Sequence, residues 1–141
     1  MRSTNNAVSR NYKIKVFWLY TMVVLYVAAG INHFIKPNIY LSIVPSYLPY
    51  HVELVYISGA CEILFGLLLI PFLTRKWAAL GIILLLIAVF PANVQMMLNY
   101  LHTNHPYTWV TILRLPLQIV LIRWAYKYYK RPALKRLAVE S

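Results

Sequence analysis

Four long apolar stretches, separated by short polar segments, dominate the pattern of hydrophobic and polar positions along the chain. They cover residues 16–35, 52–73, 77–100 and 107–126, and each reaches the ~20 residues that a helix needs to cross a bilayer. Each stretch must be a helix, because a lone strand cannot satisfy its backbone hydrogen bonds in lipid. The pattern therefore predicts an all-α membrane protein with one four-helix transmembrane domain over residues 16–126.

The connections between these stretches predict how the helices follow one another. Residues 74–76 join the second stretch to the third, and residues 101–106 join the third to the fourth. Connections this short place neighbouring helices side by side in opposite directions, so we expect an antiparallel bundle. The one long connection, residues 36–51, carries three prolines and three tyrosines around an apolar centre. We expect it to lie at the membrane interface.

Composition agrees with a membrane protein and changes how the charge is interpreted. Of the 141 residues 61% are hydrophobic and 12% charged, with a net charge of +11. The basic residues flank the apolar stretches: four in residues 1–15, two in residues 74–76 and six from Arg123 onward, against Lys36 alone in the other connections. By the positive-inside rule the basic tails, 1–15 and 127–141, are both cytoplasmic. The expected partner of these charges is the lipid bilayer and not a nucleic acid.

Five polar residues lie within or at the ends of the apolar stretches. Glu62 is one of only three acidic residues, and a charge at membrane depth is costly and usually marks a buried partner or a pathway. The others are His33, Asn93, Arg114 and Gln118. We expect these five side chains to form a polar pocket in the outer half of the membrane and treat them as candidates for ligand binding.

Helical spacing and depth predict a partner for Glu62. Glu62 shares a face with Gly59 and Gly66, small residues that let another helix approach closely. Arg114 shares a face with Gln118, and counting ~1.5 Å per residue from the outer helix ends places Arg114 within ~5 Å of the depth of Glu62. The sequence predicts an ion pair or a short polar bridge between Glu62 and Arg114. Such a pair can lock the bundle or take part in chemistry, and both readings stay open.

Cysteine and histidine offer little further chemistry. The single cysteine, Cys61, excludes a disulfide within the chain and any C-x-x-C redox pair. All four histidines fall on the outer side in the predicted topology, which leaves a metal or haem site open. Their spacing matches no metal-binding motif, so we assign no metal ligand.

Five short motifs in order carry a resemblance to a known family. They are Gly30–Pro37, Val44–Pro45 with Leu48–Pro49, Ser58–Glu62 with Gly66, Phe90–Asn93, and Arg114–Gln118. With these motifs the chain resembles the DoxX-like family of small bacterial four-span membrane proteins. The resemblance implies a four-helix bundle in the bacterial cytoplasmic membrane. It also implies a link to quinone chemistry, because the family is named after its similarity to a subunit of thiosulfate:quinone oxidoreductase.

Two functions are compatible with these observations, and whether the protein is an enzyme stays open. The first is an accessory or quinone-interacting subunit of a membrane oxidoreductase, in which Arg114 and Asn93 bind the carbonyl oxygens of a quinone and Glu62 handles a proton. The second is a non-catalytic membrane protein that binds or carries a lipophilic ligand, or a structural subunit of a membrane complex. A transporter of four spans would need to oligomerise, and the chain has no visible inverted repeat.

Overall fold

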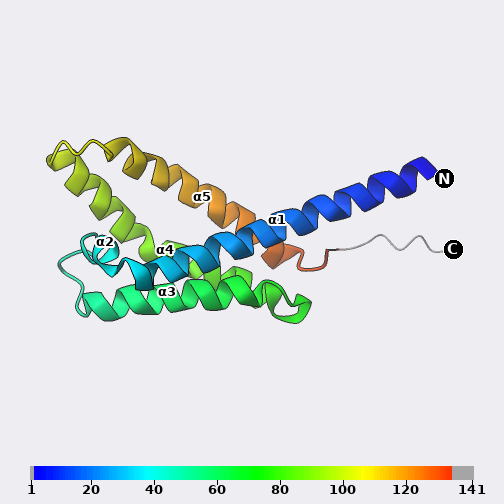
Figure 1. Cartoon of the computed structure of the whole chain (residues 1–141), viewed down its shortest axis with the longest axis horizontal. Coiled ribbons are helices and arrows are strands. Elements are labelled where there is room, and N and C mark those ends of the chain that lie inside the picture. Colours follow the sequence, from blue (N-terminus) through cyan, green and yellow to red (C-terminus); the bar gives the residue numbers. More distant parts are fainter. Residues whose placement is uncertain (1, 135–141) are drawn as a thin grey trace.

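The computed structural model describes residues 2–134, which are almost entirely helical (Figure 1). The helices are α1 (Arg2–Ile35), α2 (Pro37–Leu41), α3 (His51–Leu68), α4 (Phe72–His102) and α5 (Thr108–Lys130). All except the short α2 are long and apolar enough to cross a membrane. For the described residues, the prediction of an all-α chain with four such helices is confirmed.

The second predicted span, residues 52–73, runs past the C-terminal end of its helix. Helix α3 stops at Leu68 instead of Leu73, and Pro71 lies at the start of α4. A proline has no backbone N–H, so it is tolerated at the start of a helix and not in its interior. The guanidinium of Arg75 then donates to the carbonyl oxygens of Leu69 at 2.7 Å and Ile70 at 2.6 Å. These bonds satisfy carbonyl groups that the end of α3 leaves without helical donors.

Helical structure extends from the apolar stretches into both basic tails. Helix α1 begins at Arg2, so residues 2–15 continue the first helix, and α5 runs on to Lys130. Hydropathy marks where a helix leaves the lipid, whereas backbone hydrogen bonds can continue into water. After α5 the chain stays close to the bundle, because Arg75 donates a third hydrogen bond, of 2.7 Å, to the carbonyl of Pro132. Residues 135–141 of the predicted C-terminal tail lie outside the described residues.

The turn between α4 and α5 has a recognisable stop signal. Asn104 adopts a left-handed backbone conformation with φ of 49°, and the amide of His105 donates to the carbonyl of Tyr100 at 3.0 Å. This is the Schellman arrangement that ends many helices, with asparagine in the place that glycine usually takes.

The four long helices pack as two pairs. Helix α1 runs along α3, and α4 runs along α5, whereas α1 and α5 do not pack against each other along their backbones. The pairs converge at the end that holds the α3–α4 turn and separate toward the end that holds α2 (Figure 1). At the convergent end the rings of Trp18 and Trp124 meet at 5.8 Å. The fully buried core lies here too, including Leu19, Met22, Leu69, Ala79, Ile82 and Ala125.

Candidate functional site

A cavity of about 460 Å³ lies between the two helix pairs, near the end where they separate. Most of its lining is apolar, from side chains such as Leu25, Leu85 and Leu117. The five polar candidates also line it: His33, Glu62, Asn93, Arg114 and Gln118. Ligand pockets in proteins have volumes of about 300–1,000 Å³ and a few polar groups in an apolar wall. The size and the lining therefore suit a small lipophilic molecule with a polar head.

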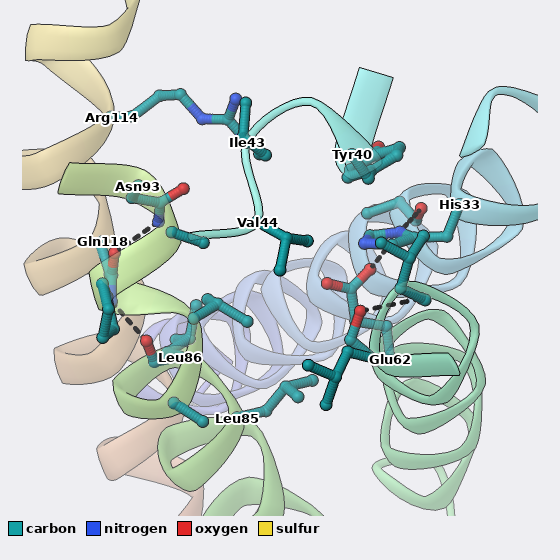
Figure 2. Close-up of a pocket in the computed structure, with 18 of the residues that line it drawn as sticks. His33, Tyr40, Ile43, Val44, Glu62, Leu85, Leu86, Asn93, Arg114 and Gln118 are labelled. Carbon is teal, nitrogen blue, oxygen red and sulfur yellow. Dashed lines mark hydrogen bonds and ion pairs between the residues drawn. The ribbon is translucent and has the colours of Figure 1, made fainter. Parts of the chain in front are cut away.

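The connection between α2 and α3 covers the mouth of this cavity. Ile43 and Pro45 are buried, although the surrounding segment has no regular structure. The carbonyl of Pro45 lies 3.1 Å from Nε2 of His51 at the start of α3. Figure 2 shows Ile43 and Val44 between Arg114 on one side and Tyr40 on the other. The segment therefore fills the gap between the helix pairs with apolar side chains.

One wall of the cavity carries Glu62 and His33. Atom Nδ1 of His33 lies 3.5 Å from Oε2 of Glu62 and 2.9 Å from the carbonyl oxygen of Ala29. The first distance exceeds the about 2.7–3.2 Å of a hydrogen bond. Because the carbonyl oxygen of Ala29 can only accept, Nδ1 of His33 carries a proton. The Glu62 carboxylate is thus held beside a single N–H that it shares with a backbone carbonyl.

Neighbours on α1 and α2 fix the orientation of the His33 ring. The ring stacks on Tyr40 with centroids 3.7 Å apart and an angle of 21° between the planes. The hydroxyl of Tyr40 in turn accepts a 2.8 Å hydrogen bond from the side chain of Asn32. The aromatic stack and this hydrogen bond join α2 to the end of α1. The segment that covers the cavity is therefore fixed to the wall that carries Glu62.

The opposite wall is built by α4 and α5. Asn93 donates to the side-chain oxygen of Gln118 at 2.7 Å, and the amide of Gln118 donates to the carbonyl of Leu86. Gln118 is 4% exposed. Leu86 is adjacent to Ile87, whose carbonyl loses its helical donor because Pro91 has no N–H. Gln118 therefore supplies a donor close to the proline in α4, and it is mainly a link between α4 and α5.

Arg114 lies on the same wall with a weaker partner. Its Nη1 atom donates to the thioether sulfur of Met96 at 3.3 Å, and a thioether is only a weak acceptor. No carboxylate among the described residues lies within ion-pair distance of this guanidinium. Figure 2 shows Arg114 and Asn93 across the cavity from Glu62 and His33. The cavity thus has a positive side and a negative side.

One comparison identifies the family of this chain. The model of a family described as "Domain of unknown function (DUF8561)" matches residues 22–129. The chain belongs to this family. The match spans the apolar part of α1 through nearly all of α5, so the DUF8561 region includes both walls of the cavity and its cover. No curated protein and no solved structure matches the chain.

The predicted bridge between Glu62 and Arg114 is wrong. Within the DUF8561 region, α3 pairs with α1 and α5 pairs with α4, so the two residues face each other from separate helix pairs. A neighbouring helix does pack closely against the small residues of α3, but this helix is α1. A Cβ atom on Gly59 would lie 2.6 Å from Cβ of His33. The partner of Glu62 is therefore His33, and Gly30, three residues before His33, was the signal that could have found it.

Counting depth from helix ends hid this pairing. Counting ~1.5 Å per residue from the predicted helix ends places His33 at a depth of ~3 Å and Glu62 at ~15 Å, yet the two side chains are in contact. Phe34, almost at the end of α1, likewise stacks on Tyr56 in α3, with centroids 5.4 Å apart. Helix α1 therefore ends beside the middle of α3. The connection that contains α2 lies beyond the end of α1.

Two buried oxygen atoms of this cavity are relevant to binding. The hydroxyl of Tyr26 and Oε2 of Glu62 are buried, and neither has a hydrogen-bond partner within the described part of the chain. Sequence reasoning missed Tyr26, because a tyrosine in an apolar helix looks like ordinary packing. A search of the described residues for three or more His, Cys, Asp or Glu side chains able to hold a metal ion finds none.

Proposed function

We propose that this protein is a DoxX-like, multi-pass protein of the bacterial cytoplasmic membrane that holds a lipophilic molecule with a polar head in the cavity. In this proposal the four long helices are antiparallel, and both termini are cytoplasmic. The distribution of basic residues, twelve on the proposed inner side against Lys36 on the outer side, supports this orientation.

The observation that carries the binding proposal is the pair of polar walls facing each other across an apolar space. Tyr26 and Glu62 each have a buried oxygen without a hydrogen bond inside the described chain. Arg114 gives one hydrogen bond to a sulfur. Buried polar groups without partners cost free energy, and a ligand that bonds to them recovers part of that cost.

A quinone is the ligand that we propose first. Arg114 and Asn93 supply donors for a ring carbonyl, and the apolar lining suits the ring and its tail. Reduction of a quinone to a quinol takes up two electrons and two protons, and Glu62 beside His33 is a group that can hold a proton. The chain would then be an accessory, quinone-interacting subunit, and the electrons would come from a membrane oxidoreductase partner.

A non-catalytic role is the second candidate, and the cover of the cavity favours it. The apolar segment around Ile43 and Val44 fills the mouth on the side away from the helix core. A covered cavity suits a protein that binds or carries a lipophilic molecule and releases it sideways. In that case Glu62 and Arg114 orient the ligand and transfer nothing.

Binding to purified protein tests the proposal. The full chain, extracted in a mild detergent, is dialysed against a short-chain quinone and its quinol, and bound ligand is quantified. We expect saturable binding that R114Q weakens by about tenfold, because a hydrogen bond to a charged group is worth about 1.5–3 kcal/mol. R123Q, an exposed arginine on the same helix, is the matched control. If neither form binds above the detergent blank, the quinone proposal is wrong.

A further inference from the structure

The two walls of the cavity have opposite hydrogen-bonding character. Glu62 and His33 meet through a carboxylate oxygen that still has lone pairs to offer. Arg114 presents N–H groups from the other wall, where the amide nitrogen of Asn93 donates to Gln118. A ligand that bridges the cavity therefore meets an acceptor on one side and donors on the other.

The carboxylate of Glu62 acts as an acceptor in this arrangement. The nearest polar atom that the structure gives it is Nδ1 of His33, and that nitrogen carries a proton because it also faces the carbonyl of Ala29. This N–H already donates to the carbonyl oxygen of Ala29 at 2.9 Å, so the carboxyl group of Glu62 receives no full hydrogen bond from it. In its ionised form the Glu62 carboxylate accepts at both oxygens and donates at neither. The group opposite the ionised carboxylate in a ligand must therefore be a donor.

The guanidinium of Arg114 has the converse restriction. It carries five N–H donors and no acceptor, and the contact with the sulfur of Met96 uses one of them. A ligand atom facing Arg114 must therefore offer a lone pair. The same ligand thus needs a donor at one end of its head and an acceptor at the other.

We propose that the cavity, with Glu62 ionised, selects the reduced, dihydroxy form of a ring ligand over the matching dione. This inference rests on the proposed function and deepens it. A dione has acceptors at both ends, so one of its carbonyl oxygens would face the Glu62 carboxylate, lone pair against lone pair. A dihydroxy ring donates an O–H to Glu62, while its other hydroxyl oxygen accepts from Arg114. No electron or proton is transferred in this selection, which is a matter of binding alone.

A matched pair of ligands tests the selection. Full-length protein in detergent is dialysed without oxygen, at an alkaline pH that keeps Glu62 ionised, against a short-chain quinone and, separately, against its quinol with the same side chain. We expect the quinol to bind about tenfold more tightly, as one hydrogen bond to a charged group provides. Equal binding, or tighter binding of the quinone, would overturn the selection and leave the proposed function standing. Absence of binding by both would remove the quinone proposal on which the selection rests.

Substitution of Glu62 tests whether this side chain causes the preference for the quinol. In E62Q the new carboxamide has an N–H for the quinone, so the preference for the quinol should fall below about threefold. E53Q is the control, because Glu53 is an exposed carboxylate in the first turn of the same helix and does not line the cavity. An unchanged preference in E62Q would contradict the assignment. If E62Q does not yield folded protein, the ratio measured on the natural chain still decides the proposal.

Discussion

Gly30 of α1 and Gly59 of α3 meet backbone to backbone. A Cβ atom on Gly30 would lie 2.5 Å from the carbonyl oxygen of Gly59, closer than real Cβ contacts allow. Small residues at such a crossing let two membrane helices approach to the distance at which dispersion contacts are strongest. The same approach brings His33 to 3.5 Å from Glu62, so the glycine contact and the acidic wall of the cavity form together.

Replacing Gly59 with alanine should therefore separate α1 from α3. The added methyl group would lie 2.6 Å from Cβ of His33, and overpacking of this kind costs about 1–3 kcal/mol. We expect G59A to lower the melting temperature of the detergent-purified protein, measured by size-exclusion chromatography after heating. The control is A60V, which adds volume at the neighbouring, exposed position. A G59A protein as stable as A60V would contradict the close crossing.

The sequence predicted the number of membrane helices well because length and hydropathy report directly on lipid. It placed their ends less well. The apolar run through Leu73 contains the turn at Pro71, which lipid tolerates because Arg75 bonds to the nearby carbonyls. The polar residues before Val16 stay helical, because a helix needs no apolar side chains once it has left the bilayer.

The sequence predicted which residues line the candidate site, but not which of them contact each other. Polar residues within apolar helices are costly in lipid and tend to face the protein interior, and all five candidates line the one cavity described above. The pairing depends on which helices are neighbours and how far one slides past another. Depth counts assume that all helices end at the same level, whereas His33 near the end of α1 lies beside Glu62, in the middle of α3.

Substitution of Arg75 by lysine separates the contribution of hydrogen-bond geometry to stability from the contribution of charge. The side chain is 7% exposed and donates from three nitrogens to the carbonyls of Leu69, Ile70 and Pro132. A lysine keeps the positive charge but cannot reproduce the planar fork of donors. R75K should therefore lose about 2–4 kcal/mol of unfolding free energy. Denaturant titration of the helical circular dichroism signal measures this loss.

The neighbouring lysine gives the matched control for that substitution. K76R exchanges the same two residue types in the opposite direction, at an exposed position. It should leave the free energy of unfolding within about 0.5 kcal/mol of the natural chain. Equal effects of R75K and K76R would mean that Arg75 acts only through its charge.

The link between Asn93 and Gln118 should be weaker than its short distance implies. Their hydrogen bond is 2.7 Å long and joins α4 to α5, yet bonds between membrane helices average about 0.6 kcal/mol and reach about 1.7 kcal/mol. We expect a coupling energy in that range from a double-mutant cycle with N93A, Q118A and both together. Additive effects of the two substitutions would show that the bond contributes nothing to stability.

The proposed orientation can be tested with single cysteines in a chain whose one natural cysteine is replaced, C61A. Y47C places a thiol in the connection between α2 and α3, where Tyr47 is 71% exposed, and N11C places one on the exposed early part of α1. Because the basic tails, the 74–76 connection and Arg123 together hold twelve lysines and arginines, the positive-inside rule puts Asn11 in the cytoplasm and Tyr47 outside. A membrane-impermeant maleimide should label Y47C in intact cells and N11C only after permeabilisation. The reverse pattern would overturn the orientation, and with it the expectation that the polar pocket lies in the outer half of the membrane.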